Sequence, residues 1–402
     1  MSAHRWQQRE AWSLLAAVLL TAAVFWSGTV DIAAARWFFR PEAADHWPLA
    51  REFPWRLLYR AASWVTAALV TAGLGAFALS LTRGRAHWRG SATLVLLAVA
   101  VGPGLIGNAV LKDHWRHPRP RDLAELGGSM HYVASPLIGA DAGASFPCGH
   151  CTVGFLLGLG WWIFRRRRPR WAAASLAAGL TAGTLLGAGR MAAGAHFFSD
   201  VIWSALLAWG VTHVLYYHVL RLEAPAVPAQ RQAGSSPVRW PGALGIATPL
   251  AGIVVLLALY ALPHGSDLTA SVALSAHSPR ILEVEADRAN ITIDVVDAPS
   301  AKLSVEGELH GFGMPGAHLG ARFETALEPA PALRYSIEAH GWLTDVDGFV
   351  SFTVPASAFA RIRVRVGRGN IQVRDTTRAG VIGAQALPLE LHTAAGTVRV
   401  SR

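Results

Sequence analysis

The sequence predicts an all-α polytopic membrane bundle, with about six core helices plus a seventh, followed by a small all-β extramembrane domain. The first observation is composition, because 52% hydrophobic and only 15% charged residues in a chain of 402 are unusual for a soluble protein. The second is the recurrence of apolar stretches of about 20 residues, the length that a membrane helix needs. The third is a change near residue 264 to short segments in which apolar and polar residues alternate.

The apolar stretches define the expected domain organisation. Those that qualify as membrane segments are residues 11–30, 57–81, 91–111, 149–164, 171–188, 200–220 and 242–262, of which the fourth and fifth are short. The domains that we expect are a first helix with an outer loop (1–56), a helical membrane core (57–220), a cytoplasmic linker (221–241), a seventh helix (242–263) and a β domain (264–402). The linker is assigned because it is rich in Pro, Ala, Ser and Gly without apolar periodicity.

The positive charge is distributed in a way that predicts topology. The net charge of +10 by itself is compatible with nucleic-acid binding, but the most basic connections fall on alternate sides of the predicted segments, as with Arg165 to Arg168 after the fourth. We therefore interpret that run as a topology anchor on the cytoplasmic side and expect no nucleic-acid partner. Residues 31–56, 112–148, 189–199 and the β domain then lie outside. We expect the chain to lie in the inner membrane of a Gram-negative-type envelope, with these parts in the periplasm. The first of these loops, which carries four arginines, follows the rule imperfectly.

The region after the last membrane segment has the pattern of β-strands. Ile362, Val364 and Val366 alternate with arginines, which predicts strands with one buried face. Its GNIQV and GTVRV turns resemble the stacked strand repeats of bacterial adhesin-like domains. An envelope partner for this domain is a possible consequence.

Polar residues gather in three of the predicted outer connections. They read KDHWRHPRP from Lys112, SFPCGH from Ser145 and GRMAAGAHFFSD from Gly189. Charged groups at a membrane boundary are candidates for a functional site. Tryptophans near the predicted boundaries are interpreted as interfacial belt residues; they are Trp37, Trp47, Trp55, Trp115, Trp161 and Trp162.

The three polar stretches resemble the signature of the type 2 phosphatidic acid phosphatase (PAP2) superfamily, which includes the vanadium haloperoxidases. The match covers about residues 57–220, with nine family positions in the family order and spacing. They are Lys112, Arg119 and Pro120 in the first motif, Pro147, Gly149 and His150 in the second, and Arg190, His196 and Asp200 in the third. The sequence departs from the family at Cys148 and Gly189, where the family has serine.

The types of these residues suit phosphoryl transfer. Lys112, Arg119 and Arg190 supply cations for phosphate oxygens, and Gly149, at the expected start of a helix, lets the backbone N–H groups approach them. Cys148 replaces a family serine that helps to hold phosphate, and a thiol is a poorer donor.

The resemblance also implies catalytic roles. His196 is implied as the nucleophile that forms a phosphohistidine, Asp200 as the residue that orients it, and His150 as the acid and then the base. His196 and Asp200 are four apart, and they share a face if that segment is helical. His114 and His117 are not family positions, and we interpret them as loop residues. We expect no cofactor and no metal, because the sequence shows no metal-ligand set. The expected partners are the membrane and a lipid phosphate, such as undecaprenyl diphosphate, phosphatidate, phosphatidylglycerol phosphate or lipid A.

The cysteines open an alternative, since Cys148-Gly-His-Cys151 resembles the active-site tetrapeptide of protein disulfide isomerases. A thiol-disulfide oxidoreductase is disfavoured because that motif belongs to a thioredoxin fold, and no strand is predicted before it. A hypothesis in which the two cysteines pair and clamp His150 out of position is also disfavoured, because the pairing would strain a regular helix.

Two further alternatives stay open. One is a haloperoxidase that binds vanadate at the same residues; a core embedded in the membrane favours a lipid phosphate instead. The other is an envelope-binding protein whose membrane core only anchors the β domain. The sequence leaves the choice of lipid and the oligomeric state undetermined.

Overall fold

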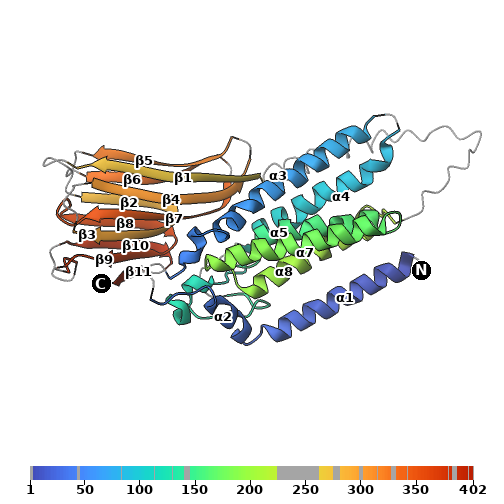
Figure 1. The fold of residues 1–402 in the computed structure, drawn as a ribbon, viewed down its shortest axis with the longest axis horizontal. Helices are drawn as coiled ribbons and strands as arrows, with labels where there is room; N and C mark the ends of the chain where they lie inside the picture. Colours follow the sequence, from blue (N-terminus) through green and yellow to red (C-terminus); the bar gives the residue numbers. More distant parts are fainter. Residues whose placement is uncertain are drawn as a thin grey trace, which may run out of the picture. The chain divides into compact units, whose positions relative to one another are not determined.

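The structure is a computed structural model that separates into two compact units, Met1–Leu262 and Pro263–Arg402, each described by itself (Figure 1). The residues that it describes are 3–42, 46–82, 84–112, 114–128, 130–139, 145–223, 262–274, 281–297, 302–314, 316–326, 332–341, 343–378, 380–382, 387–396 and 398–401. The predicted seventh membrane helix and most of the predicted linker lie outside these residues.

The first unit is helical. Its longer helices are α1 (Ala3–Val24), α2 (Thr29–Arg36), α3 (Trp55–Ser80), α4 (Arg89–Val99) continued by the π-helix η3 (Ala100–Lys112), α7 (Pro169–Ala192), and α8 (Phe198–Val214) continued by the π-helix η7 (Leu215–Val219). A shorter apolar rod consists of α5 (Gly149–Leu156), η6 (Leu157–Leu159) and α6 (Gly160–Phe164). Single 3₁₀ turns are η1 (Pro48–Arg51), η2 (Ala86–Trp88), η4 (Pro120–Asp122) and η5 (Ala124–Leu126).

Among the described residues, four helices are long and apolar enough to cross a membrane, or five if α1 and α2, bent by 77°, count as one span. The predicted α-helical membrane core is thus confirmed. One correction concerns residues 31–56, expected as an outer loop: α2 extends the helical region to Arg36, and its Asp31 is completely buried. The bend follows Gly28, which adopts φ of 74° and whose Cβ would collide with the ring of Tyr132 at 2.5 Å.

Glycines bring α7 into close backbone contact with α5 and with η6, which continues it. A Cβ on Gly154 would lie 2.7 Å from Gly183 Cα, and one on Gly179 would lie 2.3 Å from Gly158 N. Small residues are the means by which membrane helices approach each other, because lipid provides no hydrophobic drive for association. Since α5 starts at the second motif and α7 ends at the third, this interface sets the distance between two parts of the site.

A second polar cluster lies at the other end of these helices. Arg165 is 5% exposed at its side chain, forms an ion pair with Glu10 and donates to Tyr217 Oη at 2.6 Å. Besides the predicted role as a topology anchor, this arginine therefore has a structural one, because it is buried in an ion pair between α1 and the end of α6. Along α8 and η7, 17 residues separate Asp200 from Tyr217, which is about 26 Å of helix and close to the hydrocarbon thickness of a bilayer.

The second unit is the predicted β domain. Its strands are β1 (Leu262–Ala273), β2 (Ile281–Arg288), β3 (Asn290–Val296), β4 (Lys302–Gly313), β5 (His318–Ala326), β6 (Ala332–His340), β7 (Leu343–Pro355), β8 (Arg361–Arg368), β9 (Ile371–Asp375), β10 (Leu389–Ala395) and β11 (Val398–Ser401). They form a six-stranded sheet, β1-β4-β7-β3-β9-β11, and a five-stranded sheet, β10-β8-β2-β6-β5.

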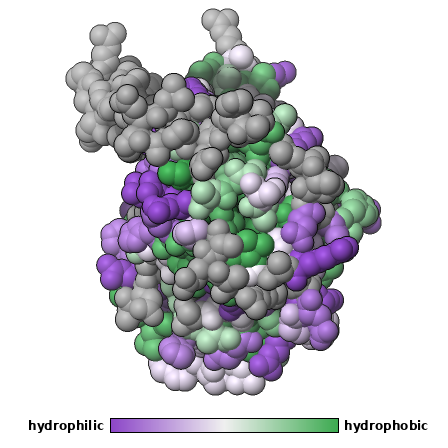
Figure 2. Space-filling model, turned by 90° about the vertical axis from the view of Figure 1, so that its left-hand side faces the viewer, coloured by the Kyte–Doolittle hydropathy of each residue, from purple (hydrophilic) through white to green (hydrophobic). Residues whose placement is uncertain are grey.

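The pairs β2–β3, β8–β9 and β10–β11 stack as parallel rungs, one strand in each sheet. The predicted alternation is confirmed, because Ile362, Val364 and Val366 are at most 2% exposed in the core between the sheets. On the outer face, Glu283 of β2 accepts hydrogen bonds from Arg334 and Arg363 of the flanking strands. Figure 2 shows the side of the molecule at the left of Figure 1, where hydrophilic residues border smaller hydrophobic areas.

Candidate active site

The third motif lies in the short connection between α7 and α8. Asp200, in the first turn of α8, accepts the backbone N–H of Phe197 at 2.9 Å, and its Oδ2 lies 3.4 Å from Nδ1 of His196. Both side chains are buried, with 1% exposure or less. The two residues do not share a helix face, because α8 begins at Phe198 and His196 precedes it. The pair forms instead because Asp200 turns back to cap its own helix.

The connection itself is held by Gly194 and Trp47. Gly194 adopts φ of 59°, and a Cβ there would lie 2.5 Å from the indole ring of Trp47. Trp47 is 6% exposed, so its interpretation as a belt residue was wrong. It packs instead under the loop that carries His196, where only glycine leaves room for the ring.

The second motif forms the start of α5. Cys148 is the N-cap with extended backbone (φ −78°, ψ 100°), Gly149 is the first helical residue, and His150 follows in the first turn, 8% exposed. The expected helix N-terminus at Gly149 is therefore present. Such a terminus directs backbone N–H groups toward an anion.

Cys148 and Cys151 form a disulfide, with 5.3 Å between their Cα atoms. The sequence left this pairing undetermined and disfavoured it because it would strain a regular helix; the structure shows the bond, and the reason is local. The expected strain assumed that both cysteines lie in a regular helix, whereas the extended N-cap conformation of Cys148 brings its Sγ back over the first turn, where it also accepts the Cys151 N–H at 3.3 Å. Cys148 consequently has no S–H to offer a phosphate, and only its backbone remains as a contact at this position.

The first motif begins at the end of η3 and continues in an extended loop. Arg119 is 8% exposed, and its backbone N–H donates to Asp122 Oδ2 at 3.1 Å, which sets the turn η4 around Pro120. Lys112 is the last residue of η3, but its side chain lies outside the described part of the structure. Arg190, in the last turn of α7, is 2% exposed.

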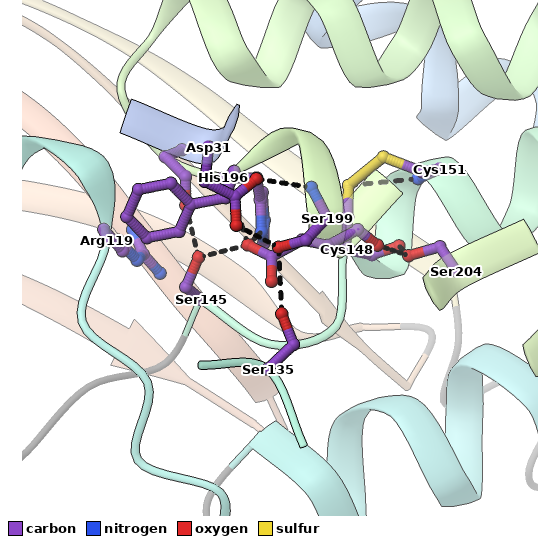
Figure 3. Close-up of polar contacts among 12 residues, drawn as sticks. Asp31, Arg119, Ser135, Ser145, Cys148, Cys151, His196, Ser199 and Ser204 are labelled. Carbon is purple, nitrogen blue, oxygen red and sulfur yellow. Dashed lines mark hydrogen bonds and ion pairs between the residues drawn. A yellow bond between two sulfur atoms is a disulfide. The ribbon is translucent and has the colours of Figure 1, made fainter. Parts of the chain in front are cut away.

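Hydrogen bonds join the three motifs into one site. The backbone N–H of Arg121 donates to Gly194 O at 3.1 Å, linking the first motif to the third, and that of Ser145 donates to His117 O at 3.1 Å, linking the second to the first. Ser145 Oγ donates to Asp200 Oδ2 at 2.5 Å, linking the second to the third. Figure 3 shows this convergence, with Ser145, Cys148 and His196 drawn from separate segments of the chain. These bonds connect the segments that carry the three motifs, and the roles of the individual motif residues stay predictions.

Several residues of the site were not singled out in the sequence. Ser145 bonds to Asp200, Ser204 Oγ donates to the Cys148 carbonyl at 2.9 Å, and Asp31 accepts hydrogen bonds from Ser199. The signal that pointed to Asp31 was available, because an acidic residue in the otherwise apolar stretch TVDIAAA is costly unless it is satisfied. Hydroxyls such as Ser145 carry no comparable signal.

The two extra histidines of the first motif differ in environment. His114 is exposed, and its Nδ1 lies 2.8 Å from Val110 O. His117 is buried, and its Nε2 lies 2.7 Å from Leu137 O. Burial lowers the pKa of His117, against the opposing effect of that backbone hydrogen bond. The imidazole of His117 therefore supports the loop in its neutral form.

An apolar cavity of about 500 Å³ adjoins the motifs. Trp115, Phe146 and Pro147 come from the motif loops, and the remaining lining residues come from α1, η3, α8 and η7; they are Val18, Val101, Ile106, Leu111, Trp203, Leu206, Leu207, Gly210, Val211, Val214 and Leu215. Cavities of this size are typical of ligand sites. Among the residues that the structure describes, no group of three or more His, Cys, Asp or Glu side chains is arranged to hold a metal ion.

The disulfide leads to a prediction. Replacing both cysteines by serine should keep phosphate release within about threefold of wild type, because Ser204 and Thr152 bond to the Cys148 carbonyl and not to its sulfur. The measurement is initial rate on a lipid phosphate, with thermal unfolding as the stability control. A closed loop this short contributes about 2 kcal/mol at most, so the melting temperature should fall modestly. Abolished activity in a folded double variant would restore the thiol-based alternative.

Comparison with known proteins agrees with the motifs. Residues 91–223 match the family model described as PAP2 superfamily. The chain is 31% identical over 140 residues to a lipid A 4'-phosphatase of Francisella tularensis subsp. novicida, covering 34% of this chain and 62% of that protein. It is 33% identical over 132 residues to a lipid A 4'-phosphatase of Rhizobium leguminosarum, covering 32% of this chain and 53% of that protein. The aligned part is thus less than two thirds of either relative.

Solved structures align with each unit at low similarity. A transmembrane PAP2 type phosphatidylglycerolphosphate phosphatase from Bacillus subtilis covers 54% of this chain and 97% of its own, with 19% identity and a TM-score of 0.36. A putative cell adhesion protein from Clostridium sporogenes covers 27% of this chain and 51% of its own, with 9% identity and a TM-score of 0.18. The resemblance recognised in the three motifs is confirmed over residues 91–223, which match the PAP2 superfamily model and overlap the alignments with the sequence relatives.

Proposed function

We propose that the protein is a membrane-integral phosphatase that removes a phosphate group from a membrane lipid, with the phosphates of lipid A as the favoured substrate. The observation that carries the proposal is the position of the site. A buried His196–Asp200 pair is hydrogen-bonded to Ser145 of the second motif, and the loop that carries it is hydrogen-bonded through Gly194 to Arg121 of the first. An apolar cavity lies beside these loops, which contribute Trp115, Phe146 and Pro147 to its lining. A phosphate site beside an apolar cavity suits a substrate that has both a phosphate and acyl chains. The named activity of the two relatives supports the choice of lipid A.

In the first chemical step, Nε2 of His196 attacks phosphorus and the bond from phosphorus to the ester oxygen breaks. A proton on Nδ1, directed at Asp200, places the lone pair on Nε2. His150 gives its proton to the departing oxygen, which leaves as the lipid alcohol. The product is a phosphohistidine on His196.

In the second step, a water molecule attacks the same phosphorus and the P–N bond breaks. His150, now deprotonated, takes a proton from the water, and inorganic phosphate leaves. Arg119, Arg190 and Lys112 stabilise the charge on the three equatorial oxygens in both steps. Because these cations provide that stabilisation, we propose that the reaction is independent of a metal ion.

We also propose an orientation in the membrane. The basic Arg165 end lies on the cytoplasmic side and the three motifs lie outside, in the periplasm if the chain belongs to an inner membrane. Support comes from the helical distance of about 26 Å between the two polar ends of α8 and η7. The periplasmic placement of the β domain and an envelope partner for it stay predictions.

The thiol-based alternative has less support. Both cysteines are completely buried and linked to each other, whereas a redox cysteine needs an accessible sulfur. No observation favours a haloperoxidase over a phosphatase, and halide oxidation by the purified protein in the presence of vanadate would be the separate test of that alternative.

The test is phosphate release by the purified protein from a panel of lipid phosphates, with chelator present and with p-nitrophenyl phosphate as a soluble substrate. Gly210 lines the cavity and has no atom within 4 Å of its Cβ position, so Gly210→Phe should fill the cavity. We expect it to lower kcat/KM for the preferred lipid at least about tenfold, since excluding two methylenes costs about 0.8 kcal/mol each. Hydrolysis of the soluble ester should be unchanged.

The matched control is Gly75→Phe in α3, because Gly75 also has open space around its Cβ position but does not line the cavity. It should leave both substrates unaffected. If the wild-type protein releases no phosphate from any lipid of the panel, the phosphatase proposal is wrong. If Gly210→Phe slows both substrates equally, the cavity is not the acyl site.

A further inference from the structure

A buried carboxylate from the N-terminal region contacts the motif-bearing end of α8. Asp31 lies in α2, is completely buried and is 168 residues away from Ser199 in the sequence. Its Oδ1 accepts the backbone N–H of Ser199 at 2.8 Å, and its Oδ2 accepts the Ser199 hydroxyl at 2.6 Å. The Tyr132 hydroxyl donates to the same Oδ2 at 2.7 Å. Three donors from two segments thus satisfy one acid.

Ser199 lies between His196 and Asp200 in the sequence. It lies in the first turn of α8 immediately before Asp200, and three residues after His196. Its hydroxyl also accepts a hydrogen bond from Ser135 at 2.9 Å, which adds the loop before the second motif to the network (Figure 3). The N–H groups of a first helical turn have no partner inside the helix. An acceptor from another segment can therefore fix the position of that turn.

Two carboxylates therefore accept hydrogen bonds at this end of α8, one from its own segment and one from another helix. Asp200 bonds locally, to the N–H of Phe197 and beside His196 Nδ1. Asp31, which lies far away in the sequence, accepts hydrogen bonds from Ser199 and so attaches the first turn of α8 to α2. Without Asp31, the turn would keep its local cap but lose the contacts that set its position relative to the rest of the bundle.

We infer that Asp31 is a positioning residue, which holds the first turn of α8 so that the Asp200 carboxylate stays in register with His196. The inference rests on the proposed phosphatase function for its kinetic consequence. It assigns a role to α2, which lies outside the segment 91–223 that matches the family. The site is thus incomplete in a fragment limited to that segment.

The experiment compares Asp31→Ala, Asp31→Asn and Tyr132→Phe in the purified full chain. Displacement of a catalytic group by about 1 Å costs about 100-fold in rate, so Asp31→Ala should lower kcat about 100-fold with little change in KM. Asp31→Asn keeps an oxygen for the Ser199 N–H but replaces the other acceptor by a donor, and should recover part of the rate. Tyr132→Phe removes one of three donors and should have the smallest effect.

A structural readout accompanies the rates, so that a fold defect is distinguished from a positioning defect. Nitrogen-15 spectra of histidine-labelled protein report the His196 imidazole, which is identified by its loss in His196→Ala. The matched control is Glu10→Gln, another mostly buried acid on the same N-terminal helices, whose partners Trp162 and Arg165 lie at the opposite polar end. It should lower the melting temperature without changing kcat or the His196 signals.

We expect the His196 signals to shift in Asp31→Ala, less in Asp31→Asn, and not in Glu10→Gln. Unchanged His196 signals together with unchanged kcat in both Asp31 variants would overturn the inference and leave the phosphatase proposal intact. If the wild-type protein is inactive on every lipid phosphate, the phosphatase proposal fails separately, and the His196 signals still decide whether Asp31 positions this residue.

Discussion

Replacing His196 by alanine should abolish phosphate release, with a loss of at least about 1,000-fold in kcat. The reason is that the imidazole of His196 is the protein group that bonds to phosphorus in the proposed reaction, and alanine cannot form that bond. Its position before α8 and beside Asp200 is independent of helix formation, so the variant should keep the melting temperature of the wild type within a few degrees. Initial rates on a lipid phosphate measure the effect.

The matched control for this variant is His114→Ala, because His114 lies in the first motif but is exposed and bonds to the backbone of its own segment. It should retain wild-type activity. Brief incubation of wild-type protein with a labelled lipid phosphate, followed by alkaline denaturation, should trap an acid-labile phosphoprotein that His196→Ala does not form. Undiminished phosphate release by His196→Ala would exclude the phosphohistidine mechanism.

Replacing Arg190 by alanine should lower kcat by about 100- to 1,000-fold, the second largest effect. Its side chain is 2% exposed at the end of α7, and removing a positioned donor from a charge-stabilising site costs about this factor. Arg190→Lys retains the charge but not the planar fork, and should recover only part of the rate. The measurement is kcat on the preferred lipid, since a group that acts on the transition state changes kcat more than KM.

The control arginine is Arg166, which is half-exposed and pairs with Glu223 at the opposite polar end of the unit. Arg166→Ala should leave kcat unchanged, because a partly exposed ion pair far from the reaction contributes little. Equal losses in Arg190→Ala and Arg166→Ala would mean that the effect is on folding. Full activity of a folded Arg190→Ala variant would remove Arg190 from the phosphate site.

The arrangement of the site also shows which kinds of information a sequence contains. The spacing of Arg190, His196 and Asp200 identified the third motif, and the pair His196–Asp200 is observed. The helical condition that the shared face required is not met, because His196 precedes α8 and the pair comes from an N-terminal cap. Helix boundaries depend on which polar groups satisfy the first turn, and that choice is made partly by tertiary partners.

The cysteines illustrate the same limit. Their spacing in CGHC was visible, but whether they pair depended on one backbone conformation, that of Cys148 at the N-cap. The three-residue spacing alone is compatible with either outcome. Disulfide formation is a matter of Cα separation and direction, which sequence distance does not determine at a helix boundary.

The sequence by itself determined the features that depend on neighbouring residues. These are the apolar spans, the alternating strands around Ile362 and the nine family positions. Only the tertiary structure decided the contacts between residues that are far apart in the sequence. The bonds of Asp31 to Ser199, the packing of Trp47 on Gly194 and the burial of Arg165 against Glu10 join segments that no periodicity relates. The physical reason is that periodicity reports which face of an element is apolar, whereas the partner of a buried polar group is selected by the packing of the whole bundle.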